Sequence, residues 1–193
     1  MRVLAVNNYP SDERFIRLYD ALRANGARTY KARWFDSSAR VFNSFDGIVL
    51  SGSPDMLSEE RVRKKFAPEI DAIGGTKVPL LGVCFGHQLL GLAFGSNVVT
   101  GRHVLKFVET ELLREDPIFA GMPPKSLLLE SHHEEVDKLP DGFSLLAKSR
   151  TSAIAAMKHP TLELYGLQFH PERSSKAKPD GNTLISNFVK GIA

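Results

Sequence analysis

The segment Gly82-Val83-Cys84-Phe85-Gly86 constrains the fold more than any other part of the sequence. It has the form Gly-x-nucleophile-x-Gly, and it joins an apolar run, Val78 to Val83, to a second apolar run, His87 to Phe94. In this pattern a buried strand turns sharply into a helix, and the flanking glycines remove Cβ atoms that would clash in the turn. The segment therefore predicts a strand–turn–helix unit with Cys84 at the turn.

Strands and helices alternate through the first half of the chain. The hydrophobic pattern predicts strands at residues 4–6, 29–34, 45–50 and 78–83. It predicts helices from a cap at Ser11 to Asn25-Gly26, over 59–73 with a break or kink near Pro68, and over 87–94. Apolar strands that alternate with helices are typical of a mostly parallel sheet covered on both faces. We therefore expect an α/β fold.

Beyond Gly95 the pattern changes to short strands joined by turns. These strands are predicted at residues 107–113, 126–130, 145–148, 154–158 and 164–169, before a closing helix at 182–192. They indicate either antiparallel additions to the same sheet or a small second layer. Because no linker, repeat or low-complexity tract interrupts the chain, we expect a single domain over residues 1–193.

Composition argues against several classes of protein. The net charge is +3, and the cluster Arg61 to Lys65 has no interleaved aromatic residues, which argues against nucleic-acid binding. A single cysteine excludes an internal disulfide and a multi-cysteine metal site, and it fits a reducing compartment. No run approaches the roughly 20 apolar residues of a membrane span, and the N-terminus has no signal-peptide pattern. We expect a cytoplasmic protein with no membrane partner.

Cys84 has the setting of a nucleophile. A sulfur at a helix N-terminus is favoured as thiolate by the helix dipole, and the N–H of Phe85 could stabilise an oxyanion. A lone cysteine is more often a small hydrophobic residue. Here the two glycines, the strand and the helix coincide, and together they favour a nucleophile. His87, on the first helical turn, is expected to be structural.

A thiol nucleophile needs a base, and the base is usually held by a third group. His170 ends the predicted strand 164–169 and is followed by Pro171-Glu172, so Glu172 could orient its imidazole. Strand ends at one edge of a parallel sheet are where α/β active sites gather. His103 and His159 are interpreted as surface residues. The roles of His132 and His133 stay open at this point.

Gly82 to Gln88, taken with Gln168-Phe169-His170-Pro171-Glu172, resembles the two motifs of the class I glutamine amidotransferase family. The resemblance covers nearly the whole chain. It implies a flavodoxin-like, mostly parallel sheet with antiparallel extensions. It also implies hydrolysis of glutamine to glutamate and ammonia through a γ-glutamyl thioester on Cys84. Such chemistry needs no metal and no organic cofactor.

Within this family, residues 130–136, 139–143 and 154–159 are similar to the separate amidotransferase subunits of archaeal GMP synthases. That likeness implies a separate ATP-dependent synthetase of the ATP pyrophosphatase type as partner, which would aminate XMP. ATP and Mg²⁺ are expected on that partner, because this chain has no Gly-x-x-x-x-Gly-Lys-Ser/Thr loop.

The resemblance also implies residues that bind the substrate. Gln88 and the backbone of Ser131, His132 and His133 are expected to hold L-glutamine. The loop that contains Gly52 and Ser53 is expected to lie against the substrate and to supply a second oxyanion N–H from Ser53.

One departure from the family pattern lies in the loop expected to supply the second oxyanion donor. Ser53 stands where the family usually has a second glycine. Gly-Ser-Pro with Cys-Phe-Gly-His-Gln is similar to stand-alone γ-glutamyl peptidases, so a hydrolase without a partner is an alternative. An amidotransferase subunit of another pathway, such as anthranilate synthase, is a second. A non-catalytic module is a third, and the intact Cys84, His170 and Glu172 argue against it.

Overall fold

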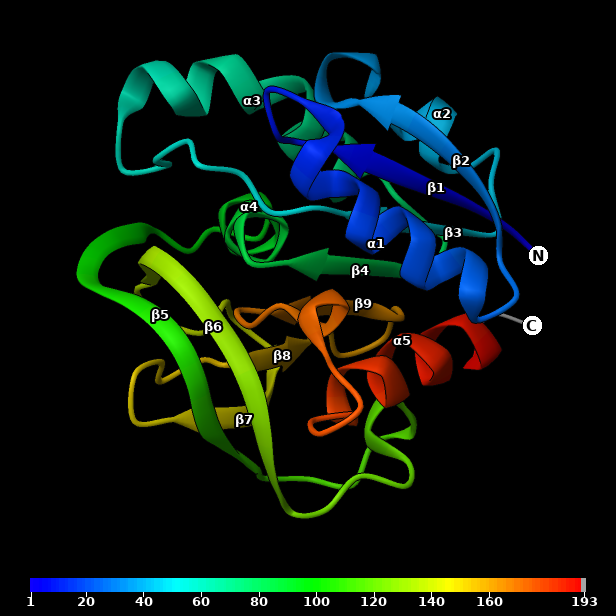
Figure 1. Cartoon of the computed structure of the whole chain (residues 1–193). Coiled ribbons are helices and arrows are strands. Elements are labelled where there is room, and N and C mark those ends of the chain that lie inside the picture. The colour runs from blue at the N-terminus through cyan, green and yellow to red at the C-terminus, as the bar shows by residue number, and fades with distance from the viewer. Residues whose placement is uncertain (192–193) are drawn as a thin grey trace.

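The structure is a computed structural model that describes residues 1–191. Nine strands form one mixed sheet in the order β2-β1-β3-β4-β9-β8-β7-β5-β6 (Figure 1). The parallel strands are β1 (Arg2–Asn7), β2 (Arg28–Arg33), β3 (Gly47–Leu50), β4 (Leu80–Val83) and β9 (Leu164–Leu167). The antiparallel strands are β5 (Val98–Leu112), β6 (Lys125–Val136), β7 (Ser144–Ser149) and β8 (Ala156–Lys158). The predicted α/β fold with antiparallel extensions is confirmed.

Helices cover both faces of the parallel part of the sheet. The α-helices are α1 (Asp12–Ala24), α2 (Ala39–Phe42), α3 (Glu60–Gly74), α4 (Phe85–Ala93) and α5 (Asp180–Gly191). Short 3₁₀ turns are η1 (Trp34–Asp36), η2 (Pro117–Phe119) and η3 (Pro171–Arg173). The predicted end of the closing helix, Ile192, lies outside the described residues. No helix within residues 1–191 is long and apolar enough to cross a membrane.

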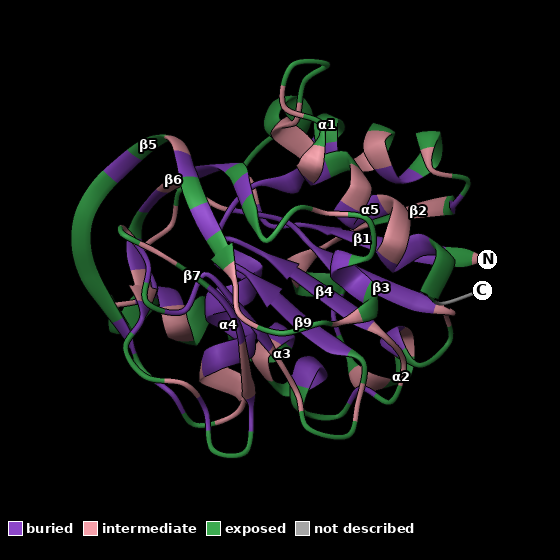
Figure 2. Ribbon diagram, turned by 90° about the horizontal axis from the view of Figure 1, so that it is seen from below, coloured by how far each residue is buried: buried purple, intermediate pink, exposed green. Residues whose placement is uncertain are grey.

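The pleat of the strands divides the apolar residues between two cores. In β1, Val3 and Ala5 pack with α1 and α5, whereas Leu4 and Val6 pack with α3 and α4. Figure 2 shows the central strands buried between the helices, whose outer faces are exposed. Burial on both faces explains why these strands have continuous apolar sequences.

Three expectations about the second half were wrong. β9 is parallel to β4, with Leu80 opposite Leu164, and is not an antiparallel addition. β5 and β6 are much longer than predicted and pair from Val98–Val136 to Glu111–Lys125, as a curved hairpin that extends beyond the parallel strands (Figure 1). β5 is mostly exposed before Val108, and β6 mixes buried with more exposed residues along its length, so an apolar run marks only part of each strand. The alternative of a second layer is also wrong, because all nine strands belong to one sheet.

Of the two alternatives predicted near Pro68, a break or a kink of the helix, the break is wrong. α3 continues from Glu60 through Pro68 to Gly74. Proline removes one backbone hydrogen bond from a helix, but Val62, Phe66 and Ile73 are buried along the inner face of α3. Burial of this face outweighs the local cost and keeps the helix continuous.

Candidate active site

The turn between β4 and α4 holds Cys84 in a backbone conformation that is rare for any residue except glycine. Cys84 has φ 51° and ψ −99°, and it has the one positive φ among the described non-glycine residues. A Cβ on Gly82 would lie 2.4 Å from the Gly86 carbonyl oxygen, and one on Gly86 would lie 2.7 Å from Leu50 Cβ. The Cys84 N–H donates to the Leu167 oxygen at 2.7 Å, which ties the turn to β9. The predicted strand–turn–helix unit is therefore observed, and tight packing maintains its strain.

His170 lies beside this turn because β4 and β9 are adjacent and parallel. Its Nδ1 is 2.7 Å from Glu172 Oε1, and each side chain is 5% exposed. Burial alone would lower the pKa of His170. The charges of Glu172 and Cys84, with hydrogen bonds to both, outweigh burial and hold this pKa well above its ordinary value. The structure thus favours an imidazolium between a sulfur and a carboxylate.

Two cavities meet at Cys84. One, of about 380 Å³, is lined by His170, Glu172, Tyr9, Ser53 and Ser131, among others. The other is small, about 30 Å³, and its lining also contains Cys84, Ser53 and Ser131. It includes the predicted substrate residues Gln88, His132 and His133 as well.

Gly52 directly precedes Ser53, which lines the larger cavity. A Cβ at this position would lie 2.5 Å from Tyr9 Oη and 3.1 Å from His170 Cε1. Glycine thus allows the loop to approach the base. The sequence did not point to Tyr9, whose pKa is raised by burial and then by the charges of Glu172 and Cys84. Its hydroxyl is therefore neutral and can donate a hydrogen bond.

The two predicted oxyanion donors, the N–H groups of Phe85 and Ser53, have no acceptor among residues 1–191. Ser53 does not have a positive φ, so its backbone conformation is open to a non-glycine residue. Its hydroxyl accepts the Asp55 N–H at 3.1 Å. The serine thus fits the loop and adds a turn contact.

Gln168, a glutamine for which no role was predicted, contacts the sulfur of Cys84. Gln168 Nε2 lies 3.7 Å from Cys84 Sγ, and Gln168 Oε1 accepts from Gln88 Nε2 at 3.3 Å. The Cys84 thiol lies 3.5 Å from the Ser131 carbonyl oxygen. Gln168 belongs to the motif at residues 168–172, but the motif alone assigns it no role. Its position two residues before His170 is the signal that could have found it, because the side-chain period of an extended chain is two.

The remaining histidines lie in other surroundings, and His159 Nδ1 accepts the backbone N–H groups of Thr161 and Leu162 at 3.2 and 3.1 Å. His132 Nε2 lies 3.0 Å from the buried Glu130, whereas the exposed ring of His133 stacks on His103 at 4.0 Å. His87 is fully buried, and burial lowers its pKa to about 3, so the ring is neutral. None of these rings is hydrogen-bonded to Cys84 in the described part of the chain. This leaves His170 as the candidate base.

The carboxyl group of Glu130 is stabilised in its charged form. Burial would raise its pKa. Hydrogen bonds from His132, Ser149 and Thr151 outweigh burial and lower this pKa below its ordinary value. The Ser149 and Thr151 hydroxyls each donate at 2.6 Å. This network connects β6 to the end of β7 and to Thr151 just beyond it.

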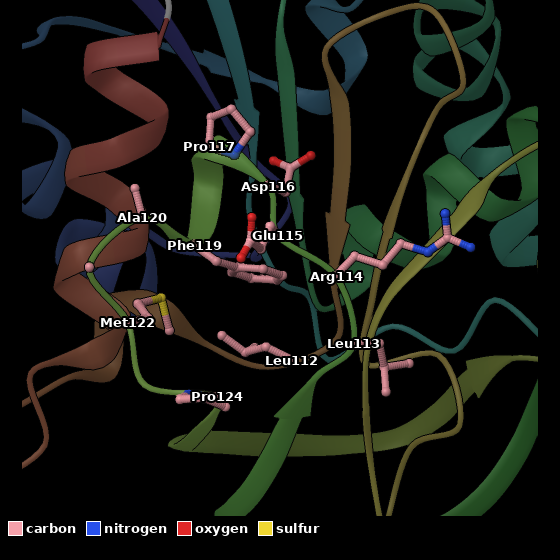
Figure 3. Close-up of a pocket in the computed structure, with 11 residues that line it drawn as sticks. Leu112, Leu113, Arg114, Glu115, Asp116, Pro117, Phe119, Ala120, Met122 and Pro124 are labelled. Carbon is pink, nitrogen blue, oxygen red and sulfur yellow. The ribbon is translucent and has the colours of Figure 1, made fainter.

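A larger hollow, about 660 Å³, lies elsewhere, around residues 112–124. Figure 3 shows Leu112, Phe119 and Met122 among the residues that line it, while the Arg114 side chain extends away from them. None of the site residues described above lines it. It therefore has no part in the candidate site.

Comparison with known proteins identifies the family. The family model of class I glutamine amidotransferases matches residues 7–192. The chain belongs to this family, and it is a glutamine-hydrolysing amidotransferase.

Within the family, the chain is similar to subunits of GMP synthases. The chain is 44% identical over 146 residues to the glutamine-hydrolysing subunit of GMP synthase from Methanosarcina mazei, a match that covers 75% of this chain and 72% of that protein. It is 41% identical over 145 residues to the same subunit from Pyrococcus abyssi, and this match covers 75% of this chain and 74% of that protein. A solved structure from Thermoplasma acidophilum, described as that of a GMP synthase subunit, is similar with a TM-score of 0.86 and 30% identity. That match covers 100% of this chain and 93% of the other.

Proposed function

We propose that Cys84, His170 and Glu172 hydrolyse L-glutamine to glutamate and ammonia, and that the ammonia aminates XMP to GMP on a separate synthetase. The observation that carries the chemistry is the strained Cys84 at the junction of two cavities, beside the buried His170–Glu172 pair. The similarity to archaeal GMP synthase subunits supports the pathway.

In the first step the Cys84 thiolate adds to the side-chain carbonyl carbon of glutamine. The carbonyl electron pair moves to oxygen, and the N–H groups of Phe85 and Ser53 stabilise that charge. His170 then gives its Nε2 proton to the amide nitrogen, the C–N bond breaks, and NH₃ leaves a γ-glutamyl thioester. Glu172 accepts the Nδ1–H bond throughout and stabilises the imidazolium.

The second step hydrolyses the thioester. His170, now neutral, takes a proton from water, and the hydroxide adds to the thioester carbon. The tetrahedral intermediate expels the Cys84 thiolate and leaves glutamate. The small cavity, with Gln88 and residues 131–133 in its wall, would hold the amino-acid end of the substrate. The hydrolysis requires no metal or organic cofactor.

The partner would supply the other half of the reaction. An amination must activate its acceptor, and we assign ATP and Mg²⁺ to a synthetase of the ATP pyrophosphatase type. Ammonia released into water would be protonated and lost, so docking should join the two sites. The docked complex then supplies ammonia where the acceptor is activated.

The test is glutamate release measured with and without the XMP-aminating synthetase, ATP and XMP. We expect slower hydrolysis by the chain alone than with all three components, because docking should complete the site and join it to the place where the acceptor is activated. Ser53→Gly, assayed in parallel, shows whether the serine limits the free chain. Hydrolysis by the chain that no synthetase component changes would contradict the partner assignment.

One observation favours a second candidate, a γ-glutamyl hydrolase that acts alone. Arg14, Arg17 and Arg173 line the 380 Å³ cavity on the His170 side, where the leaving group departs. That cavity is larger than ammonia requires, and its guanidinium groups would suit an amine that carries a carboxylate, such as the second residue of γ-glutamyl-glutamate. A higher kcat/KM for this dipeptide than for glutamine, lost in Arg17→Ala, would favour the hydrolase.

A further inference from the structure

The loop Ser51–Ser53 carries the proposed second oxyanion donor, and the Ser51 hydroxyl organises it. The Ser51 Oγ accepts the Asn8 backbone N–H at 2.9 Å and donates to the Gly52 carbonyl oxygen at 2.9 Å. The Ser51 N–H donates to the Val6 oxygen at 3.1 Å. These bonds attach the loop to the carboxyl end of β1.

The bond to the Gly52 oxygen also sets the direction of the Ser53 N–H. The Gly52 carbonyl and the Ser53 N–H belong to one planar trans peptide, in which they point in opposite directions. Fixing the oxygen therefore fixes the donor. Ser53 lines both cavities that meet at Cys84, so the orientation of this peptide bears on catalysis.

Behind the loop, the side chain of Asn8 joins Ser51 to Glu69. Asn8 Nδ2 lies 3.3 Å from the Ser51 carbonyl oxygen and 3.2 Å from Glu69 Oε1. Both of these atoms accept, so the amide orientation is determined: the NH₂ group must face them. The side-chain amide of Asn8 thus connects Glu69 in α3 to the Ser51–Ser53 loop.

Two buried oxygens of this pair lack a partner among the described residues, Asn8 Oδ1 and Glu69 Oε2. The Glu69 side chain is fully buried. Leaving two buried acceptors unpaired is costly. If Glu69 carries a proton on Oε2, this oxygen becomes a donor that Asn8 Oδ1 can accept, and the acid and the amide form a closed ring with two hydrogen bonds.

The surroundings of Glu69 favour that proton. Burial raises the pKa of Glu69 to about 8, opposed by the hydrogen bond from Asn8. α3 packs against α4, α2 and η1, whose titratable residues are His87, Arg40 and Asp36. None of the three contributes to this pKa.

We propose that protonated Glu69 and Asn8 form a buried acid–amide pair that positions the Ser51–Ser53 loop and so directs the Ser53 N–H toward the substrate oxygen. The inference rests on the proposed function, because it assigns Ser53 to the oxyanion. Asn8 and Glu69 are positioning residues and contact no substrate.

The first experiment separates positioning from folding by glutamate release, with the synthetase, ATP and XMP added where the chain alone is too slow. Glu69→Gln keeps a donor toward Asn8 Oδ1 and should retain kcat within about twofold. Glu69→Leu and Ser51→Ala should lower kcat by about tenfold or more, because loss of one oxyanion donor costs about a hundred- to a thousandfold. KM for glutamine and the rate at which iodoacetamide alkylates Cys84 should not change, since alkylation forms no oxyanion.

Ile73→Ala is the matched control. Ile73 is fully buried in α3, one turn beyond Glu69. This variant should lower the melting temperature and leave kcat unchanged. If Glu69→Leu does not fold, Ser51→Ala and Glu69→Gln still decide the question.

The second experiment detects the proton directly. In wild type, infrared difference spectroscopy should show one protonated carboxyl at about pH 6.5 that titrates near pH 8 and is absent from Glu69→Gln. The kcat of wild type should fall above that pH by a step that Glu69→Gln lacks. A Glu69 already ionised in the lower-pH spectrum, full kcat in Ser51→Ala, or equal losses in the Gln and Leu variants would overturn the inference. A wild type that releases no glutamate even with the synthetase would reject the proposed function, while the infrared measurement would still test the pair.

Discussion

At the scale of single residues, the site depends on one strained backbone. A non-glycine residue in the conformation of Cys84 costs of the order of 1–3 kcal/mol. That strain is maintained by the hydrogen bond from Cys84 to Leu167 and by the close approach of Gly82 and Gly86 to neighbouring backbone. The strained turn places Cys84, at the margin of the core, where it lines both cavities.

Replacing Cys84 should therefore separate activity from stability. Cys84→Ala and Cys84→Gly should both abolish glutamate release, because one sulfur carries the covalent step. Cys84→Gly should unfold at higher urea than Cys84→Ala, with a difference of about 1 kcal/mol, because glycine accepts a positive φ without strain. Equal stability of the two variants would show that the turn is not strained. Glutamate release by Cys84→Ala at the parent rate would contradict its role as nucleophile.

His170 and Glu172 should act with Cys84 as one unit. His170→Ala should be nearly as damaging as Cys84→Ala, and Glu172→Gln less so, since in the proposed mechanism Glu172 orients the ring and His170 moves the proton. The double variant Cys84→Ala/His170→Ala should be no slower than the slower single variant. Turnover measured for these four proteins tests the assignment, and strictly additive losses in the double variant would argue against it.

At the scale of elements, the secondary structure could be predicted where all the residues that determine it lie in one continuous segment. The β4–turn–α4 unit was predictable because its glycines, apolar strand and apolar helix are contiguous. The pairing of β9 with β4 was not, since no local pattern says which strands become neighbours. The Asn8–Glu69 contact joins residues 61 positions apart, and Glu69 on a predicted polar helix gave no sign of burial.

The β5–β6 hairpin also fixes the start of the segment that leads into α3. Glu134 in β6 accepts the N–H groups of Leu57 and Ser58 at 2.6 and 2.9 Å. These donors lie a few residues after the Ser51–Ser53 loop. The hairpin therefore forms one wall of the small cavity and holds this segment beside it.

Removing this carboxylate should destabilise the fold. Glu134→Ala leaves two N–H groups without an acceptor, so we expect a loss of about 2–3 kcal/mol in the free energy of unfolding. Glu135→Ala, at the adjacent position of the same strand, is the control and should change this free energy by about 0.5 kcal/mol or less. Urea denaturation of both variants checks the difference. Similar losses would mean that Glu134 does not anchor the segment.

At the scale of the whole molecule, the candidate site is a consequence of strand order. Asn8 and Tyr9 follow β1, Ser51–Ser53 follow β3, Cys84 follows β4, and His170 lies three residues beyond β9. These strands are neighbours in the order β1-β3-β4-β9. Because all four are parallel, their carboxyl ends meet at one edge of the sheet. Residues far apart in the chain thus converge without a local sequence signal.

The same burial that builds the site predicts how stability depends on pH. Glu69 has an ordinary pKa of 4.5 and a folded pKa of about 8. Between these values the unfolded chain loses a proton that the folded chain keeps, so stability falls as pH rises. His87 acts in the opposite direction: its ordinary pKa is 6.5 and its folded pKa about 3, so stability falls as pH drops below 6.5. The fold should be most stable between about pH 5 and 6.5.

Glu69→Gln should remove the part of the alkaline slope that comes from Glu69. From about pH 6.5 to 8 the wild type should lose a few kcal/mol in its free energy of unfolding, because Glu69 and His170 both have raised pKa values and each unit of pKa shift corresponds to about 1.4 kcal/mol. Glu69→Gln should keep only the fall from His170 over this range, and between about pH 5 and 6.5 its stability should rise, because Glu69 no longer offsets His87. Glu115→Gln, at an exposed glutamate, is the control and should keep the wild-type slope. Urea unfolding at several pH values measures all three, and a parallel decline in wild type and Glu69→Gln would mean that Glu69 is ionised in the folded chain.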